Sequence, residues 1–424
     1  MDTLGKIWRY KDIRNKLLVV LGLLVATRII AHIPMPGVDL EQLRYFFQQN
    51  QIFGLLNLFS GGTISNFSVA LMGVSPYITS SIVFQLLAML VPKLEEMQKE
   101  GESGRNKINQ YTRLLTVPLA ITQGYGMLYL LRSQGIIPGW DLYQLIIMLI
   151  SITAGSMILM WIGEIITNKG IGNGISMIIT IGILSGLPSQ IRNTASIISL
   201  GDVEKIISII IFAIVAILII AAIVLVTEGQ RNLPVSYAKR ARGAGSFSAV
   251  NSFLPIKVNT AGVIPIIFAM SMMVVPGVAA KFFENASSAW VSGAATFIGD
   301  LFKNNVFYGI SYFVLVVLFT YFYTYVVFKP DQISENLQKQ GGFIPGIRPG
   351  NETTHYLGNI ITRITLTSSV FLGLIAVLPF IIQALTNIET LVIGGTGILI
   401  VVSVVIETMN QLQAQLTMHT YDNY

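Results

Sequence analysis

The sequence contains no cysteine and only three histidines. The absence of cysteine excludes disulfides and thiolate chemistry. The histidines, His32, His355 and His419, are too scattered along the chain to indicate a metal cluster. No metal site is predicted.

Charged residues are scarce as well. Asp, Glu, Lys and Arg make up 11% of the 424 residues and hydrophobic residues 53%, whereas a soluble domain carries about 25% charged residues. No polar stretch is long enough to form a separate water-soluble domain. The first apolar segment follows basic residues, as in a signal peptide, but it lacks a small-residue cleavage site and is interpreted as a retained span. A single membrane domain over residues 1–424 is expected.

Catalytic motifs are missing too. The sequence has no HExxH, P-loop or GxSxG motif, and the GIGNG run at 170–174 follows a helical segment, so it is interpreted as a tight turn between helices. No Asp or Glu lies at the centre of an apolar segment, where ion-coupling carboxylates usually lie. A secondary transporter or an intramembrane enzyme would need such ligands or a catalytic pair, so neither is favoured. We therefore expect that the protein is not an enzyme and that it binds no cofactor.

Ten segments meet or approach the length of a membrane span. About 20 mainly apolar residues cross the roughly 30 Å of hydrocarbon, because each helical residue advances about 1.5 Å. The second segment follows a Gly-rich stretch, and the fifth is short, between Gly172 and Pro188. The predicted fold is an all-α membrane protein with spans at residues 17–34, 70–91, 112–131, 143–166, 172–187, 206–227, 258–276, 307–328, 362–383 and 391–410.

The positive charges predict the orientation of these spans. If the N-terminus is cytoplasmic, 20 of the 27 Lys and Arg residues fall on the cytoplasmic side and six on the opposite side. Basic loops favour the cytoplasm, so both termini are expected there. The remaining residue, Arg28, lies inside the first span, where it could snorkel, bind a backbone carbonyl or serve a function.

The number of spans allows two halves of opposite topology. Five spans precede the loop 188–205, which gives an N-terminal half at 1–188 and a C-terminal half at 189–424. Inverted repeats are common in transport proteins and place the pathway at their interface. The halves share no sequence similarity, so ten spans without internal symmetry are the alternative.

Uncharged polar residues gather in three of the spans. They are Thr79, Ser80, Ser81 and Gln85 in span two, Thr122 and Gln123 in span three, and Asn259 and Thr260 at the start of span seven. Such side chains can simply hydrogen-bond between helices, contributing about 0.6–2 kcal/mol each. Alternatively they form a seam that opens, because polar contacts can be exchanged for water.

The two longest basic loops, at about 228–257 and 329–361, are the predicted docking surfaces for a partner. In the second loop, glycine and proline around Arg348 would hold its guanidinium on a stiff tip that suits a carboxylate or phosphate. Setting the topology and binding anionic lipid are the alternative roles.

Five long motifs then point to a family. They are GVSPYITSSIVFQLL (73–87), EGESGRNKINQYTR (100–113), GIGNGIS (170–176), KVNTAGVIP (257–265) and FIPGIRPG (343–350). In this order, and over essentially the whole chain, they resemble the signatures of the SecY/Sec61-alpha family of protein-conducting channels.

The resemblance implies a passive channel between two inverted five-helix halves around a central hourglass pore. It implies a plug at about 57–67, including Asn57, Phe59, Ser60, Gly61, Gly62, Ile64 and Phe67, and a pore ring of Ile78, Ile82, Ile179, Ile183, Ile267 and Ile400. A lateral gate would open between spans two and three and spans seven and eight. The gate residues would be Thr79, Ser80, Gln85, Thr122, Gln123, Asn259 and Thr260.

The same resemblance implies the setting of the channel. The expected location is the bacterial plasma membrane, with unfolded preproteins and signal sequences as substrates and membrane lipid around the gate. A SecA motor ATPase or the ribosome would dock at Lys239, Arg240 and Arg348, with no nucleic acid bound beyond ribosomal RNA. SecE-like and SecG-like membrane subunits would complete the assembly.

Overall fold

A computed structural model describes most of the chain. The described residues are 10–35, 63–64, 66–133, 135, 137, 139, 141–199, 203–237, 250–284, 288–386 and 390–421. All structural statements below concern these residues.

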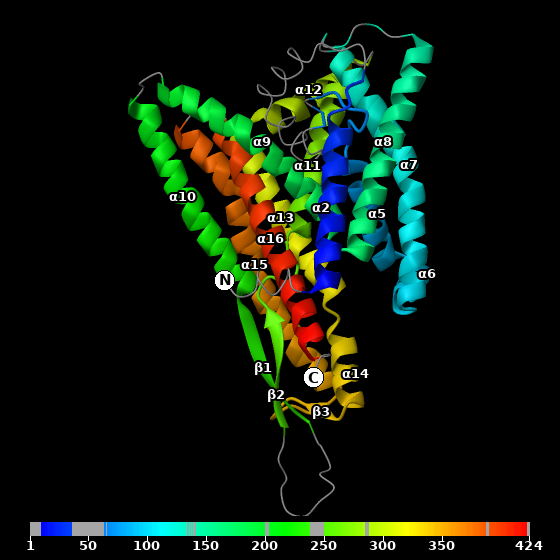
Figure 1. The fold of residues 1–424 in the computed structure, drawn as a ribbon, viewed down its shortest axis with the longest axis vertical. Helices are drawn as coiled ribbons and strands as arrows, with labels where there is room; N and C mark the ends of the chain where they lie inside the picture. The colour runs from blue at the N-terminus through cyan, green and yellow to red at the C-terminus, as the bar shows by residue number, and fades with distance from the viewer. Residues whose placement is uncertain are drawn as a thin grey trace, which may run out of the picture.

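Ten helices of at least 16 residues lie in the described part, one for each predicted span. By length and hydropathy alone, five described helices could cross a membrane, or six if α5 and the short helix after it form one bent span. The ten helices of at least 16 residues are consistent with the ten predicted spans, and the apolar helices confirm the α-helical membrane fold (Figure 1). The ten helices are α2 (Lys11–Ala31), α5 (Ser75–Leu90), α7 (Glu102–Ser133), α8 (Leu142–Lys169), α9 (Gly174–Ser199), α10 (Val203–Glu228), α11 (Ile264–Phe283), α13 (Asn305–Val327), α15 (Asn351–Thr386) and α16 (Thr390–Tyr421).

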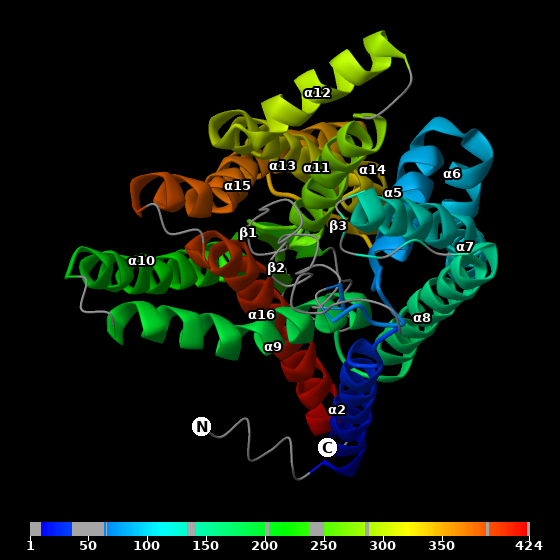
Figure 2. The same cartoon turned by 90° about the horizontal axis from the view of Figure 1, so that it is seen from above.

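The helices form two groups that meet on two sides. The first group holds α2, α5, α7, α8 and α9, and the second holds α10, α11, α13, α15 and α16 (Figure 2). On one side α9 packs against α10 and α16, and on the other α11 packs against α5 and α7. The two groups therefore touch at two contacts, one made by α9 and the other made by α11.

The turn between α8 and α9 depends on glycine. Gly172 has φ +89°, a left-handed conformation that favours glycine. A Cβ at Gly174 would collide with the backbone carbonyl oxygen of Gly163, so the start of α9 lies directly against α8. Asn173 caps α9, accepting hydrogen bonds from the N–H groups of Ile175 and Ser176 at 3.1 and 3.2 Å. The tight turn predicted from the GIGNG run is confirmed.

Helix α9 is longer than the sequence indicates. Its apolar part, Gly174–Pro188, agrees with the approximate fifth span, but the helix itself continues through Pro188 to Ser199. Proline is tolerated inside membrane helices when other groups satisfy the freed carbonyl. The predicted boundary between the halves at 188 and 189 therefore falls inside a helix.

The two long basic loops fold together outside the bundle, which the sequence reading missed. Strands β1 (Gln230–Tyr237) and β2 (Val250–Lys257) form an antiparallel hairpin, and β3 (Gly342–Phe343) pairs with the other edge of β1, in the order β2-β1-β3. Helix α14 (Pro330–Lys339) lies beside them (Figure 1). These elements and the start of α15 share one apolar core: Leu233, Val235, Ile256, Leu337, Ile344, Leu357, Ile360 and Ile361.

Two shorter helices flank the spans. Helix α6 (Pro92–Lys99) follows α5 after a bend of 101° at Val91, because Pro92 begins a new helix there. Helix α12 (Ala289–Lys303) connects α11 to α13 at the end of the bundle away from the sheet (Figure 1).

Candidate functional site

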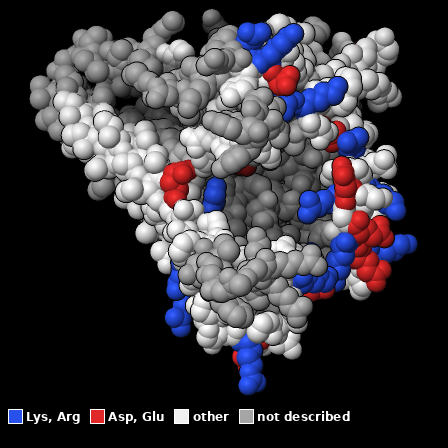
Figure 3. Space-filling view, turned by 60° about the horizontal axis from the view of Figure 1, so that its bottom comes forward, with Lys and Arg blue, Asp and Glu red and all other residues white. Residues whose placement is uncertain are grey.

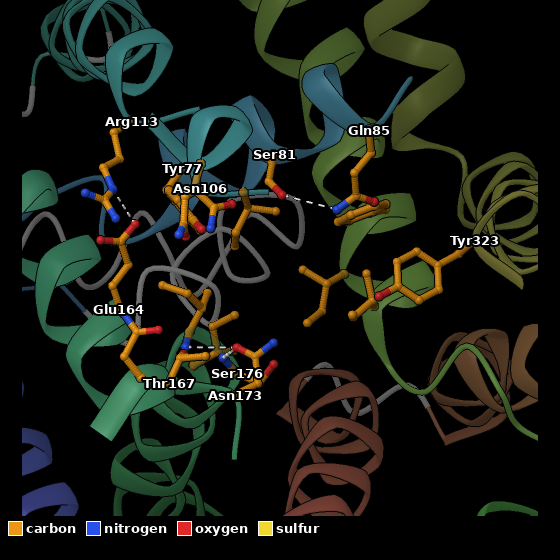
Figure 4. Close-up of a pocket in the computed structure, with 18 residues that line it drawn as sticks. Tyr77, Ser81, Gln85, Asn106, Arg113, Glu164, Thr167, Asn173, Ser176 and Tyr323 are labelled. Carbon is orange, nitrogen blue, oxygen red and sulfur yellow. Dashed lines mark hydrogen bonds and ion pairs between the residues drawn. The ribbon is translucent and has the colours of Figure 1, made fainter. Parts of the chain in front are cut away.

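A pocket of about 300 Å³ opens between the two helix groups. The first group lines it from α5, α7, α8, α9 and the α8–α9 turn, and α11 and α13 of the second group line it opposite (Figure 4). Its walls carry neutral polar side chains such as Asn106, Asn109 and Asn168, whereas Ile78, Ile179 and Ile267 supply apolar surface. A polar cavity bordered by branched apolar side chains therefore lies where the groups meet.

The six isoleucines of the predicted ring all belong to one large cluster of buried apolar residues. They derive from α5, α9, α11 and α16, so both helix groups contribute. Each is at most 8% exposed: Ile78, Ile82, Ile179, Ile183, Ile267 and Ile400. The three of them that also line the pocket place this cluster directly against the cavity. Their role as a ring stays a prediction.

Helix α16 reaches this cluster through a glycine. A Cβ at Gly397 would lie 2.8 Å from Ile183 Cγ2, closer than side chains normally pack. Because Gly397 has no side chain, α16 can approach α9 and bring Ile400 into the cluster.

One ion pair lines the pocket, and the sequence reading did not identify it. Arg113 Nε donates a hydrogen bond to Glu164 Oε1 at 2.7 Å, joining α7 to α8 (Figure 4). The Glu164 side chain is 13% exposed and that of Arg113 43%. The signal in the sequence was a pair of opposite charges at the cytoplasmic ends of adjacent predicted spans, but spacing alone does not show which helices are neighbours.

The predicted gate residues on α5 and α7 bind each other. Gln123 Nε2 donates to Thr79 Oγ1 at 3.3 Å, and the fully buried Ser80 donates to the carbonyl oxygen of Thr112 at 2.7 Å. Both bonds join α5 to α7. The two helices are therefore linked into one unit by the polar side chains assigned to the gate.

The other gate residues bind within their own segments. Gln85 Nε2 donates to Ser81 Oγ (Figure 4) and Thr122 to carbonyls of its own helix. Asn259 and Thr260 lie in the turn before α11, which begins at Ile264, a few residues after the approximate predicted start of span seven. Among the described side chains of the predicted gate, none hydrogen-bonds from α5 or α7 to α11.

Two buried amide oxygens of the predicted gate residues lack a hydrogen-bond donor in the described part of the chain. Gln85 Oε1 and Gln123 Oε1 are shielded from solvent and accept no hydrogen bond among the described residues. An unsatisfied buried acceptor costs about 1–3 kcal/mol. If the helices that carry Gln85 and Gln123 moved away from their neighbours, water could donate to these oxygens and remove this cost, which lowers the energy of the separated state.

The predicted plug is described only at its end. Ile64 and Phe67 are fully buried, but in a second cluster with Met35, Leu71, Met72 and residues of α7 and α8. The backbone here is tied to the end of α2, since Met35 N–H donates to the Phe67 carbonyl at 2.8 Å. Asn57, Phe59, Ser60, Gly61 and Gly62 lie outside the described residues.

Of the predicted docking residues, Arg348 is described. It is exposed between Gly346 at φ +85° and Gly350 at φ +104°, and Thr353 Oγ1 donates to its carbonyl at 2.9 Å. Lys239 and Arg240 lie outside the described residues. Lys and Arg side chains are spread over the face that Figure 3 shows, and Asp and Glu side chains are densest at its right edge.

Helix α6 carries an exposed ion pair. The hydrogen bond from Lys99 to Glu95, 2.7 Å long, holds the pKa of the Glu95 carboxyl below its usual value and raises the pKa of Lys99. Both groups stay charged near neutral pH. Groups of His, Asp and Glu suited to a metal do not occur in the described part of the chain.

A second contact between the helix groups lies opposite α11. The Gly172 N–H donates to Gln411 Oε1 of α16 at 2.7 Å, and Lys16 of α2 donates to Gln415 at 3.4 Å. A small apolar cluster surrounds these bonds: Ile13, Ile171, Leu412 and Leu416. This side of the interface has both apolar and hydrogen-bonded contacts.

Comparison with known proteins gives one consistent result. The model of the SecY family matches residues 68–409. The chain is 38% identical to the protein translocase subunit SecY of Streptomyces galbus, covering all of this chain and 99% of the relative. Its fold is similar to a structure described as a protein conducting channel, at a TM-score of 0.66, 20% identity and coverage of 94% of this chain and 91% of the other. Sec61 in a canine ribosome-channel complex matches at a TM-score of 0.63, 19% identity and the same coverage.

Proposed function

The chain belongs to the SecY family of protein translocase subunits, and we propose that it conducts unfolded polypeptides between its two helix groups. The observation that supports this proposal is that six buried isoleucines from both groups belong to one large apolar cluster, and that three of them also line a polar pocket. A polypeptide would enter the pocket, pass between the isoleucines and leave at the far end. The polar walls keep the entrance wet, and the isoleucines form the barrier.

The isoleucines suit a seal that has no sequence preference. Dispersion contacts between branched side chains and a passing chain are individually weak and non-directional, so they close around any polypeptide without binding it tightly. When no chain is present, the constriction is apolar and excludes water, which blocks small ions by dewetting. Ile78 of the first group and Ile267 of the second group both line the pocket.

The contact of α11 with α5 and α7 is the proposed lateral gate. The bonds Gln123–Thr79 and Ser80–Thr112 keep α5 and α7 together, so they would move as one unit away from α11. Apolar segments of a substrate would then partition into lipid, favoured by about 25 cal/mol per Å² of apolar surface. A signal sequence would shift the equilibrium toward the open gate by binding that state.

The α9–α16 contact is the side that we propose stays closed. It combines the Gly172–Gln411 hydrogen bond with the apolar cluster around Ile171 and Leu412. Opening at α11 with this side intact is a hinge motion between the two groups. The plug at about 57–67 is proposed to be tethered through Ile64 and Phe67, whose burial against α7 and α8 anchors its end.

The chain is a multi-pass membrane protein, and we propose the bacterial plasma membrane with both termini in the cytoplasm. The Lys and Arg side chains on the face that Figure 3 shows support this orientation, since basic loops favour the cytoplasm. A motor ATPase similar to SecA or the ribosome would dock here at Arg348, Lys239 and Arg240. SecE-like and SecG-like subunits are the proposed membrane partners.

Crosslinking tests the route directly. A photoreactive residue at Ile82, in the isoleucine cluster, should crosslink to a preprotein stalled in transit. The same probe at Ile217, which is 67% exposed on the outside of α10, is the control and should crosslink mainly to lipid. Crosslinks of the preprotein at Ile217 and not at Ile82 would refute the proposed pathway.

A further inference from the structure

Helix α12 has two apolar faces, and only one of them is packed against the protein. On the packed face, Ala295 is buried and Phe302 stacks edge-on against Phe307 and Tyr308, with ring centroids 5.6 and 6.4 Å away. Through this face α12 contacts α11 and α13. The helix is thus held in a defined place.

The second apolar face is open. Trp290, Ala294, Phe297 and Leu301 recur at intervals of four and three residues, which places them on one stripe of the helix. Trp290 is 82% exposed and Phe297 66%. Among the described residues, Trp290 has the highest exposed fraction of any large apolar side chain, which indicates that something other than this chain covers the stripe.

A polar strip runs along a third face. Ser292, Thr296 and Asp300 recur every four residues. The two hydroxyls donate to backbone carbonyls, Ser292 to Glu284 at 2.6 Å and Thr296 to Ser292 at 3.1 Å. The open stripe therefore lies between a packed face and a polar face, an arrangement typical of helices in the plane of a membrane surface.

The position of α12 identifies the occupant as lipid. Figure 2 shows α12 at the outer edge of the bundle, beside α11 and α13 and away from the space between the helix groups. Immediately after α12, the outer surface of α13 begins with Val306 and continues through Ile310 and Val314, exposed by 69%, 61% and 47%. In a membrane protein this surface contacts hydrocarbon, and the stripe of α12 continues it.

We propose that α12 is an interfacial lipid-binding helix, with Trp290 and Phe297 inserted at the boundary between lipid headgroups and acyl chains, in the leaflet at the end of the bundle away from the sheet. Tryptophan is favoured at this depth because its ring is amphipathic. Because α12 follows α11 directly, lipid binding would also hold the outer end of α11 at the membrane surface.

Fluorescence of a protein with a single tryptophan tests the proposal. The sequence has four tryptophans, and the variant Trp8→Phe, Trp140→Phe, Trp161→Phe keeps only Trp290. The full chain is reconstituted into vesicles of phosphatidylethanolamine and phosphatidylglycerol, with bromine near either the headgroup end or the methyl end of the acyl chains. We expect strong quenching by the first lipid, weaker quenching by the second and little quenching by aqueous iodide.

Two results of the quenching experiment would overturn the proposal, and a comparison of two variants tests it further. Dominant quenching by iodide would place the stripe in water, and protection from both iodide and brominated lipid would show that protein covers it. In the same background, Phe297→Asp should reduce the lipid quenching and shift the emission to the red, while Thr296→Asp on the polar face should leave both unchanged. Equal behaviour of these two variants would also contradict the proposal.

Discussion

The N–H of Gly172 and the side-chain oxygen of Gln411 are 2.7 Å apart, in a hydrogen bond between the turn that precedes α9 and the distal part of α16. The two residues are 239 positions apart in the sequence and belong to different helix groups. The bond lies on the side of the molecule away from the α11 contact. It therefore joins the two groups where the proposed hinge requires them to stay together.

Replacement of Gln411 by leucine should weaken this contact. The Gly172 N–H would lose its acceptor, at a cost of about 1 kcal/mol, and the thermal midpoint of the purified protein should fall. Gln413→Leu is the matched control, because Gln413 is exposed on the same helix. Equal midpoints for the two variants would show that the bond contributes nothing to stability.

Gly174→Ala should destabilise the protein more strongly. The added methyl group would collide with the carbonyl oxygen of Gly163, which is backbone and cannot rotate away, and overpacking of this kind costs about 1–3 kcal/mol. Gly22→Ala in α2 is the control, since nothing lies within 4 Å of its Cβ position. Thermal unfolding measures both; a loss confined to Gly22→Ala would contradict the close approach of α8 and α9.

Serine at both Ile82 and Ile183 should make the resting channel leak ions. The hydroxyls would hydrate the constriction and remove the dry barrier. Conductance of the reconstituted protein in a planar bilayer measures the leak. Ile210→Ser with Ile217→Ser on the outer face of α10 makes the same chemical change outside the cluster, and a tight seal in both double variants would remove Ile82 and Ile183 from the ring.

The Arg113–Glu164 pair should show energetic coupling. Arg113→Met leaves the mostly buried Glu164 carboxylate without its partner, which should lower stability by about 1–3 kcal/mol. The double variant Arg113→Met, Glu164→Met should lose less than the sum of the single variants, by about 1 kcal/mol. Strictly additive losses in thermal unfolding would mean that the pair does not hold α7 to α8.

Arg348→Glu should impair docking without affecting the fold. The side chain is exposed on a turn, where substitutions usually change stability by less than about 0.5 kcal/mol. Motor-driven translocation into vesicles should fall, while expression and the thermal midpoint persist. Arg231→Glu, an exposed site on β1 with the same change in charge, should have a smaller effect on translocation. A lower midpoint for Arg348→Glu would indicate a structural role instead.

The sequence predicted the helical membrane fold well and the connections between helices less well. The ten predicted spans are consistent with the ten helices of at least 16 residues in the described part of the chain, because the length of hydrocarbon to be crossed is fixed and hydropathy reports it. The extension of α9 through Pro188 was missed because a proline ends a helix in water more often than in a membrane bundle. The β1–β2 hairpin was missed because its core is shared with α14 and α15, which lie about 100 residues further along the chain.

In the candidate site, the apolar residues were easier to predict from the sequence than the contacts of the polar residues. The motif positions named the six isoleucines, and all six are buried in one large apolar cluster, while their role as a ring stays a prediction. The polar residues assigned to a gate were harder to interpret, because a side chain such as Ser80 can face either neighbour of its helix. In the structure Ser80 donates to the carbonyl oxygen of Thr112 in α7. The polar bonds therefore join α5 to α7 on one side of the proposed gate and do not reach α11 on the other side.

By itself, therefore, the sequence determined that the chain is an α-helical membrane protein and which family its motifs resemble, since these depend on composition and local order. Only the tertiary structure decided which partners the polar and charged groups take: Gln123 with Thr79, Arg113 with Glu164, Gly172 with Gln411. Each of these pairs joins residues far apart in the chain. Their pairing depends on the rotation and packing of whole helices, which apolar periodicity leaves open because lipid and protein interior are equally apolar.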